Sequence, residues 1–418
     1  MILVLIYNFV LISIVITLLP IILIAFWIQP KFRAGFKEKI GFYKFNNNKK
    51  RATVFHAVSV GETNAIKELV KTYREQNPDD IIIVTTTTKT GQETAQKAFA
   101  NIVDKVTYFP YDFFFSVLLF FKAYNPEKVI IAETEIWPSF VTIAKFLGIK
   151  VYTVNGRISP HSFDGYKKIK LFLAPILNNY EKIFMQSVAD AERLVTIGAK
   201  ADKTEVMGNL KFDITPNLTE EEKNKFREEL KTNKYRLFIG ASTHKGEDDI
   251  VLAAFKYVKC TERDAKLLLV PRHPQRYEEV SKLLDNCGLK WGKRTNNANF
   301  DDYDIILLDT MGELAKLFSI CHIAFIGGSF SQTGGHNPLE ANVWSKPVIS
   351  GPCTFNFKDV YKIVTEKNCA VIVNDESEFK KELLSFYQDE EKYNKYCQNA
   401  SSVFDENRGA ISYVLERI

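Results

Sequence analysis

Short runs of β-forming residues alternate with helical patterns along almost the whole chain, and this alternation constrains the fold more than any other feature. Examples are residues 53–60 and 128–134 in the first half and residues 236–243 and 323–330 in the second. Several runs are nearly all apolar, as expected of parallel strands that are covered on both faces. Alternating strands and helices predict doubly wound parallel sheets. We therefore expect an α/β protein with two Rossmann-like domains that face a cleft.

The two halves are separated by a stretch that begins after residue 213. It combines the turn-forming run 215–219 with a highly charged helical segment, residues 220–231. The asparagine- and lysine-rich residues 46–50 indicate a flexible spacer ahead of the first strand. The expected parts of the folded region are an N-terminal Rossmann-like domain over 52–213, a linker with a charged helix over 214–234, and a C-terminal Rossmann-like domain over 235–418.

Residues 2–28 carry no charged side chain. This apolar run is longer than the roughly 20 residues that a bilayer-spanning helix needs. We predict one transmembrane helix within an anchor over residues 1–30, with Pro20 as the place of a kink and Trp27 at the interface. A cleavable signal peptide fits less well, because the run has no basic start and no small-residue cleavage site. A buried core helix is the alternative.

Positive charge is concentrated directly after this apolar run. Residues 31–51 contain eight basic side chains and one acidic side chain, a net charge of +7, whereas the whole chain carries +5. By the positive-inside rule, the folded domains are expected on the cytoplasmic side of the cell inner membrane, where anionic headgroups would attract the basic segment. A nucleic-acid-binding protein would carry its excess charge across the folded domains, so no nucleic-acid partner is expected.

The cysteines do not suggest a disulfide framework or a zinc site. All six are widely spaced and none forms a CxxC pair. Such a pattern is typical of reduced thiols in a cytoplasmic protein.

The glycine-rich segment 327–340 gives the strongest local indication of a ligand site. It follows an apolar strand, contains two glycine pairs and predicts a helix that begins at Asn337. Glycine pairs let the backbone approach a ligand, Asn is a favourable N-cap, and Pro338 suits the first helical turn. The free N–H groups of a helix start attract anions, and Glu340 could accept hydrogen bonds from sugar hydroxyls. The segment predicts phosphate or nucleotide binding, with a tight strand-to-helix turn as the alternative.

Other strand ends in the second half of the chain also indicate phosphate or nucleotide binding. Ser242 and Thr243 lie in a turn of small residues before a helix. Pro271 and Arg272 end the next strand, where a guanidinium group can hold a phosphate or carboxylate bidentately. Backbone amides around Met311 are available to a base or ribose. Together these turns predict a mononucleotide pocket.

In the first half, Glu62 begins a helix after the first strand. A carboxylate at that place is kept ionised by the helix dipole and could accept a proton, although a purely dipole-pairing role is the alternative. Glu133 and Glu135 end another apolar strand, where two carboxylates are costly unless one faces a polar cleft. Arg157 and Lys211 bring cations to further strand ends, with surface salt bridges as the default alternative.

Two other patterns have a structural explanation that we favour. Asp302 and Asp304 have the spacing of a DxD metal motif, but the acidic run reads as a solvated loop, and no metal site is expected. The aromatic run Phe113–Phe121 is interpreted as a core helix, with a surface that dips into the membrane as the alternative.

Taken together, these segments resemble the Kdo (3-deoxy-D-manno-octulosonic acid) transferases of lipopolysaccharide synthesis. Matching segments follow one another in family order and span nearly everything from residue 41 to residue 360. They are 41–43, 56–62, 111–112, 133–138, 155–159, 186–198, 208–213, 242–247, 271–274, 309–314, 327–340 and 356–359. The sequence departs from the family pattern at Gly156, Lys245 and residues 161–163, and the last of these puts details of acceptor binding in doubt.

The resemblance implies a GT-B glycosyltransferase that moves Kdo from CMP-Kdo to the phosphorylated lipid A precursor (lipid IV-A) with inversion, without metal or other cofactor. The position of Glu62 matches the general base, and Glu133 and Lys211 match residues that stabilise the transition state. Lys211 could pair with the carboxylate of the donor or with charge that develops near it. The residues that match CMP contacts are Pro271, Arg272, Met311, Gly312, Glu313, Asn337, Pro338, Leu339 and Glu340, with Ser242 and Thr243 as additional phosphate contacts.

Two alternatives of different classes remain. A sugar-nucleotide epimerase or hydrolase on the same fold would act on a soluble substrate. Such an enzyme would not need the membrane anchor that the apolar N-terminal run predicts. A non-catalytic, membrane-tethered module that binds an anionic glycolipid would tolerate the loss of Glu62.

Overall fold

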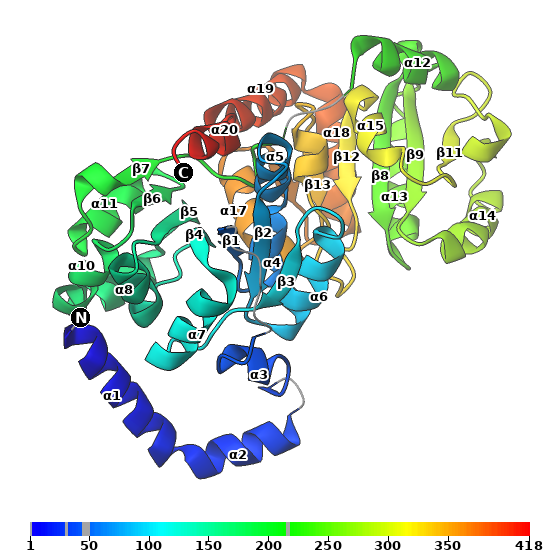
Figure 1. The fold of residues 1–418 in the computed structure, drawn as a ribbon. Coiled ribbons are helices and arrows are strands. Elements are labelled where there is room, and N and C mark those ends of the chain that lie inside the picture. The colour runs from blue at the N-terminus through cyan, green and yellow to red at the C-terminus, as the bar shows by residue number, and fades with distance from the viewer. Residues whose placement is uncertain (1, 30–31, 44–50, 215–217) are drawn as a thin grey trace. The chain divides into compact units, whose positions relative to one another are not determined.

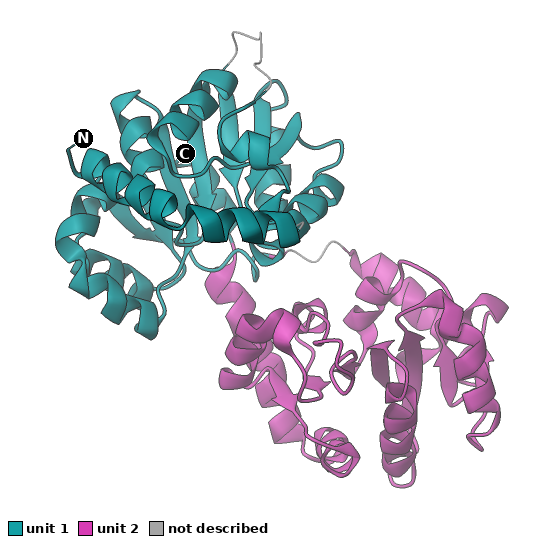
Figure 2. Ribbon diagram, turned by 90° about the horizontal axis from the view of Figure 1, so that it is seen from below, with its two compact units in different colours: residues 1–213, 409–418 teal, residues 214–408 magenta. Residues whose placement is uncertain are grey.

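The computed structural model describes residues 2–29, 32–43, 51–214 and 218–418. The chain forms two compact units: residues 1–213 with 409–418 make unit 1, and residues 214–408 make unit 2 (Figure 2). The spacer expected over 46–50 lies outside the described residues, as do residues 215–217 of the expected linker. Each unit contains its own parallel sheet, so the expectation of two doubly wound α/β domains is confirmed.

Unit 1 is built on a seven-stranded parallel sheet with the order β3-β2-β1-β4-β5-β6-β7 (Figure 1). The order changes direction between β1 and β4, and ligands of such sheets bind beyond the carboxyl ends of the strands at this switch point. The strands are β1 (Ala52–His56), β2 (Ile81–Thr86), β3 (Lys105–Tyr108), β4 (Pro126–Ala132), β5 (Lys150–Gly156), β6 (Lys182–Met185) and β7 (Thr204–Val206). The helices around them are α4 (Val60–Ala65), α5 (Lys67–Gln76), α6 (Lys89–Ala98), α7 (Phe114–Tyr124), α8 (Pro138–Phe146), α9 (Pro160–Lys168), α10 (Lys170–Leu177), α11 (Val188–Thr196) and α20 (Ala410–Leu415).

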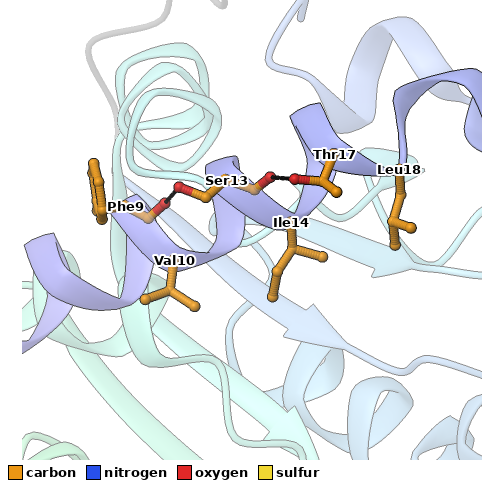
Figure 3. A pocket seen from close by; sticks show the side chains of 6 residues that line it. All are labelled: Phe9, Val10, Ser13, Ile14, Thr17 and Leu18. Carbon is orange, nitrogen blue, oxygen red and sulfur yellow. Dashed lines mark hydrogen bonds between the residues drawn. The ribbon is translucent and has the colours of Figure 1, made fainter.

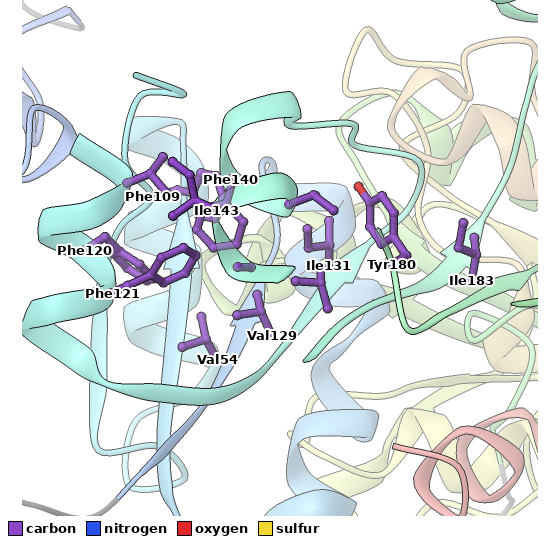
Figure 4. Close-up of a cluster of buried hydrophobic side chains, with 14 of the residues drawn as sticks. Val54, Phe109, Phe120, Phe121, Val129, Ile131, Phe140, Ile143, Tyr180 and Ile183 are labelled. Carbon is purple, nitrogen blue, oxygen red and sulfur yellow. The ribbon is translucent and has the colours of Figure 1, made fainter. Parts of the chain in front are cut away.

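An aromatic layer fills the space between this sheet and α7 and α8 (Figure 4). The Phe140 ring lies 4.6 Å from the Phe109 ring and 4.7 Å from the Phe121 ring, measured between centroids. Full burial of each such side chain contributes about 1.5–3 kcal/mol. The run Phe113–Phe121 therefore supplies a core helix, as favoured from the sequence. Phe115 and Leu119 are exceptions, with 73% and 36% of their surface exposed.

Residues 409–418 pack on unit 1, although the sequence pattern predicts them as part of the C-terminal domain. The Asp213 carboxylate accepts hydrogen bonds from Gly409 N at 2.9 Å and from Ile411 N at 2.6 Å. Ala410 and Val414 are buried in a core cluster of this unit. The chain thus crosses back after unit 2, which local sequence patterns do not reveal.

The apolar N-terminal run forms two helices, α1 (Ile2–Thr17) and α2 (Leu19–Ile28), where one helix with a kink at Pro20 was expected. They are bent by 67° relative to each other. Pro20 explains the break, because proline lacks the N–H of a helix interior and its ring clashes with the preceding turn. No single described helix is long and apolar enough to cross a membrane, but this bent pair meets the length and composition requirement together. A short helix follows, α3 (Phe36–Lys39).

Unit 2 contains a second seven-stranded parallel sheet, with the order β10-β11-β9-β8-β12-β13-β14. Its strands are β8 (Arg236–Thr243), β9 (Ala265–Pro271), β10 (Trp291–Lys293), β11 (Ile305–Leu307), β12 (Ile323–Ile326), β13 (Val348–Ser350) and β14 (Ala370–Ile372). Its helices are α12 (Glu220–Leu230), α13 (Glu247–Lys259), α14 (Tyr277–Asp285), α15 (Leu314–Leu317), α16 (Leu339–Asn342), α17 (Lys358–Glu366), α18 (Glu376–Gln388) and α19 (Glu390–Asn407). The charged helix expected from the sequence is α12, which begins with a capping box formed by Thr219 and Glu222.

Candidate active site

Glu62 lies at the carboxyl edge of the first sheet, in the first turn of α4. Ser59 is the N-cap of that helix. The Glu62 carboxylate accepts hydrogen bonds from Val58 N at 2.7 Å and from Ser59 Oγ at 2.9 Å. Only 8% of the residue is exposed. The strand-to-helix turn therefore holds one buried carboxylate in a fixed orientation.

Burial raises the pKa of the Glu62 carboxyl group from 4.5 to about 7. The hydrogen bonds from Val58 and Ser59 oppose this effect, whereas the negative charges of Glu133 and Glu135 add to it. A carboxyl group with a pKa near the working pH can exchange a proton readily in either direction. The site therefore has the property that a general base requires, and the effect of Glu133 shows that these two carboxylates lie within electrostatic reach.

Glu133 follows β4 in a left-handed conformation, with φ of +56°. Its Oε2 lies 3.6 Å from Arg157 Nε, beyond the end of the neighbouring β5. Thr134 joins the same two strand ends, because its Oγ1 donates to Arg157 O at 2.6 Å. Non-glycine residues with positive φ are uncommon, and they are often found at functional sites.

Lys211 belongs to a loop that follows β7 and folds back over β5. Leu210 N donates to Asn155 Oδ1 at 3.0 Å, and Lys211 N donates to Asn209 Oδ1 at 3.0 Å. The Lys211 side chain is half-buried. The structure places Lys211 at the same sheet edge as Glu62 and Glu133, but no contact joins it directly to either of them.

His56, at the end of β1, has a structural environment. Its ring stacks on Phe109 with centroids 3.7 Å apart, and its Nδ1 lies 3.0 Å from Thr85 Oγ1. Complete burial lowers the pKa of the imidazole to about 3. His56 is therefore neutral at ordinary pH and poorly suited to proton exchange.

In unit 2, the first glycine pair of the predicted phosphate loop surrounds a carboxylate of the protein itself. Glu247 Oε2 accepts from Gly328 N at 2.7 Å and from His244 N at 2.8 Å. Its Oε1 accepts from Ser329 N and Phe330 N, both at 2.8 Å. Glu247 is 1% exposed. The amides of residues 328–330 thus hold an internal anion, which corrects the expectation that they would face a phosphate.

Two predicted phosphate contacts, Ser242 and Thr243, are the last residues of β8 and differ in burial. Thr243 is fully buried, and its hydroxyl donates to Asp248 Oδ1 at 2.6 Å. Asp248 in turn is paired with Arg276. The Thr243 hydroxyl is thus engaged in a hydrogen bond inside unit 2. Ser242 is partly exposed and has a φ of +54°.

The second glycine pair leads into α16, whose start lies two residues beyond the Asn337 expected from the sequence. This helix begins at Leu339 and has a single turn. Asn337 Oδ1 still accepts from Leu339 N at 3.1 Å, so Asn337 caps the turn locally. Pro338 is the N-cap position of α16 and is buried together with Leu339. A single turn offers free amides but only a weak dipole.

Several ionisable side chains converge beside this turn. His336 Nε2 lies 2.9 Å from His244 Nε2. Burial, together with the charge of Arg272, lowers the pKa of His336 to about 4. Desolvation raises the pKa of Glu340, and the charge of Arg272 opposes that effect. Arg272 itself is exposed directly after β9 and Pro271. The charge of Arg272 thus acts on both His336 and Glu340 at this edge of the second sheet.

The loop after β11 lines a cavity of about 570 Å³. Met311 is 74% exposed, and Gly312 has a φ of +87°. The Glu313 carboxylate accepts a hydrogen bond from Arg294 at 3.2 Å. The residues that line the cavity are Glu229, Arg294, Thr295, Asn297, Thr310, Met311 and Glu313. The predicted base contacts thus lie at a hollow of the same carboxyl edge as Arg272.

The acidic run before β11 has structural partners. Asp304 lies 3.0 Å from Lys259 Nζ and 3.1 Å from Lys266 Nζ, and Asp302 accepts from Asn299 Nδ2 at 2.9 Å. Over the described ranges, no group of three or more His, Cys, Asp or Glu side chains is arranged to hold a metal ion.

Sequence reasoning did not identify the roles of Glu247 and the His244–His336 pair. Glu247 appeared only as the last residue of a small-residue turn, and three of the four amides that donate to it are 81 to 83 positions away in the chain. His336 lay inside the glycine-rich segment without an assigned role. The sequence offered one signal, an acidic residue at the start of the segment that forms α13.

Comparison with known proteins identifies the family. Residues 34–214 match the family described as 3-deoxy-D-manno-octulosonic-acid transferase (kdotransferase). The 3-deoxy-D-manno-octulosonic acid transferase of Haemophilus influenzae is 33% identical over 391 residues, which cover 93% of this chain and 91% of the relative. A protein of the same name from Rickettsia bellii is 31% identical over 348 residues, 82% of this chain and 81% of the relative.

A solved structure supports the fold. A putative UDP-N-acetylglucosamine 2-epimerase from Listeria monocytogenes aligns with a TM-score of 0.52 and 13% identity, over 88% of this chain and 95% of that one. At such low identity the likeness concerns the two-domain α/β fold alone. The family match and the two relatives go further: this chain belongs to the Kdo transferases, the glycosyltransferases of lipopolysaccharide synthesis.

Proposed function

We propose that this glycosyltransferase moves Kdo from CMP-Kdo to the phosphorylated lipid A precursor, lipid IV-A, with inversion of the anomeric carbon. The observation that carries the proposal is the buried Glu62, whose pKa of about 7 suits a general base, in a chain of the Kdo transferase family. Glu62 takes the proton of the acceptor hydroxyl while that oxygen attacks the anomeric carbon. The bond from this carbon to the phosphate oxygen breaks, and CMP leaves.

Unit 2 binds the leaving nucleotide in this proposal. Arg272 pairs with the phosphate, whose negative charge grows as the bond breaks. Asn337, Pro338, Leu339 and Glu340 contact CMP beside Arg272, where Asn337 and Glu340 supply backbone N–H groups and Glu340 also supplies a carboxylate. Met311, Gly312 and Glu313 hold the base or ribose, and Ser242 adds a phosphate contact. The hydroxyl of Thr243 is assigned no role, because Asp248 accepts its hydrogen bond.

Unit 1 serves the acceptor and the reacting sugar. The sugar acquires oxocarbenium character in the transition state, and Glu133 stabilises this positive charge. Lys211 pairs with the carboxylate of the donor or with charge that develops near it. Both residues lie at the sheet edge that carries Glu62. The reaction needs no metal in this proposal, because Arg272 and backbone amides neutralise the leaving group.

We further propose that the enzyme acts on the cytoplasmic side of the inner membrane. Its acceptor is a lipid, and the apolar run 2–28 followed by the basic segment 31–51 would keep the active site near that lipid.

The direct test is incubation of the purified full-length protein with CMP-Kdo and lipid IV-A, followed by mass spectrometry of the lipid. We expect addition of Kdo and release of CMP. Glu62→Ala should lower turnover by roughly 100-fold or more, as for loss of a general base, while CMP binding is preserved. Release of free Kdo without lipid product would indicate a hydrolase, and normal turnover of Glu62→Ala would refute the assigned role.

A further inference from the structure

One end of the helix pair α1–α2 is fixed to unit 1 by a buried amide. Asn8 is 5% exposed. Its Nδ2 donates to Ser139 Oγ at 2.8 Å, and its Oδ1 accepts from Phe114 N at 2.8 Å. α1 packs against α8 at this place. Because a buried polar group without a partner is costly, these hydrogen bonds hold the start of α1 on the surface of unit 1.

Beyond α2 the chain returns to the same unit. Tyr111 N donates to Lys39 O at 2.7 Å, and Tyr43 Oη donates to Tyr108 O at 3.1 Å. Tyr43 belongs to the core cluster of unit 1. Figure 1 shows α1 leaving the unit near α8 and α2 leading back toward α3. Both ends of the helix pair are therefore attached to one folded unit.

Between these two attachments the surface is apolar. α2 has no buried residue, and Trp27 is 82% exposed. Figure 3 shows one face of α1, where the Ser13 and Thr17 hydroxyls donate to the carbonyls one turn earlier, both at 2.8 Å. Such back-bonding satisfies the hydroxyls inside the helix. This face borders a hollow of about 430 Å³ lined by Phe9, Val10, Ser13, Ile14, Thr17 and Leu18.

Exposed basic side chains lie next to α1. Lys167, Lys168 and Lys170 follow one another at the junction of α9 and α10, and Leu171 beside them is 91% exposed. The Phe172 ring lies 6.0 Å from the Tyr7 ring of α1, measured between centroids. A run of lysines beside exposed apolar side chains suits the headgroup region of an anionic membrane.

We propose that α1 and α2 form a bent re-entrant segment, which enters and leaves a single leaflet of an anionic phospholipid bilayer. This topology replaces the single crossing that was expected from the length of the apolar run. A crossing would place the start of α1 across the bilayer from unit 1. It would require Asn8 to leave Ser139 and Phe114, and their buried polar groups would lose their partners.

The dimensions agree with a single leaflet. The 16 residues of α1 span about 24 Å at 1.5 Å per residue, and part of that length lies on unit 1. The hydrocarbon core of a bilayer is roughly 30 Å thick. The bend between Thr17 and Leu19 is therefore the deepest point of the segment.

Site-directed labelling tests this topology. In full-length protein with the exposed Cys260 and the partly exposed Cys353 and Cys397 changed to serine, Ile2→Cys is added, and the protein is bound to vesicles of phosphatidylethanolamine and phosphatidylglycerol. A membrane-impermeant maleimide is then applied from the side of the catalytic units. We expect labelling without detergent. Labelling that requires detergent would overturn the proposal.

Nitroxide labels at Ile2, Leu18 and Trp27, each as a single cysteine variant, measure depth independently through their collision with oxygen and with a water-soluble nickel complex. A re-entrant segment predicts that Leu18 is deepest and that Ile2 and Trp27 are shallow. If the labels at Ile2 and Trp27 lay at opposite interfaces of the bilayer, with the label at Leu18 between them, the re-entrant topology would be refuted.

The role of Asn8 is tested with a matched pair of variants in the Ile2→Cys background. Asn8→Leu removes the attachment to Ser139, so we expect a severalfold smaller labelled fraction before detergent. Ser13→Leu adds the same side chain at an exposed position of α1 and should leave labelling unchanged. Circular dichroism and urea unfolding show whether unit 1 stays folded in both variants. Unchanged labelling of a folded Asn8→Leu protein would contradict the proposed attachment.

Discussion

The buried Glu62 carboxylate should make the folded protein less stable above pH 7 than a neutral side chain would. Its pKa rises from 4.5 to about 7 on folding, mainly because burial disfavours the charged form. The folded state therefore binds this proton more tightly than the unfolded state. Below pH 4.5 both states are protonated and the group costs nothing; as pH rises to about 7, the free energy of unfolding falls. At 1.36 kcal/mol per pH unit, the loss reaches about 3 kcal/mol.

Glu62→Gln removes this charge while keeping the shape and one acceptor oxygen. We expect the variant to unfold at a higher urea concentration than wild type at pH 8, with a gain of up to about 3 kcal/mol, and to show a much smaller difference at pH 5. Glu68→Gln on the neighbouring α5 is the matched control, because Glu68 is exposed. Equal effects of Glu62→Gln at both pH values would refute the reasoning.

The same pKa governs catalysis in the proposed mechanism. If Glu62 accepts the proton, kcat/KM should fall about tenfold per pH unit below pH 7, because only the ionised form acts as a base. Ser59→Ala removes a hydrogen bond that favours this form, so the acidic limb should move to higher pH by about one unit. Ser187→Ala removes another N-cap in unit 1 and should not move it. An acidic limb near pH 4.5 in wild type would rule out Glu62 as the titrating base.

Three further predictions concern the other sites. Arg272→Ala should weaken CMP-Kdo binding about tenfold, the loss of a charge-assisted hydrogen bond, whereas the exposed Arg263→Ala should not; calorimetry with CMP-Kdo decides. Glu247→Gln should lower the free energy of unfolding by at least about 2 kcal/mol, because four backbone donors lose a charged partner, and Asp249→Asn should have little effect; urea unfolding at pH 7 compares them. Deletion of residues 409–418 should speed hydrogen exchange in α5 of unit 1, which packs against α20, and unchanged exchange would count against that contact.

Alternation of apolar strands and helical patterns was sufficient to predict both sheets, because burial on both faces leaves a local signature in each strand. The position of Glu62 at the start of a helix could also be predicted, because neighbouring residues indicate both the glycine turn and the helix start. These features depend on interactions that lie close together in sequence. They were accessible without any knowledge of tertiary contacts.

Features that depend on distant partners were not accessible. The amides of residues 328–330 could have faced a ligand or a side chain, and only the fold brings Glu247 to them. Thr243 appeared free for a phosphate until Asp248 was seen to accept its hydrogen bond. The break at Pro20 was foreseen as a kink, but the attachment of Asn8 to Ser139 joins residues 131 positions apart. Each of these cases is a competition between ligand, solvent and protein for one polar group.

The return of residues 409–418 to unit 1 makes unit 2 an insertion within unit 1. As the ribosome produces the chain, the first sheet emerges long before α20, and all of unit 2 must be translated in between. Until then, the surface that later covers Ala410 and Val414 has no partner. Unit 2 is one continuous stretch of chain and can fold as soon as it has been synthesised. We therefore expect unit 1 to begin folding before unit 2 but to reach its native structure after it.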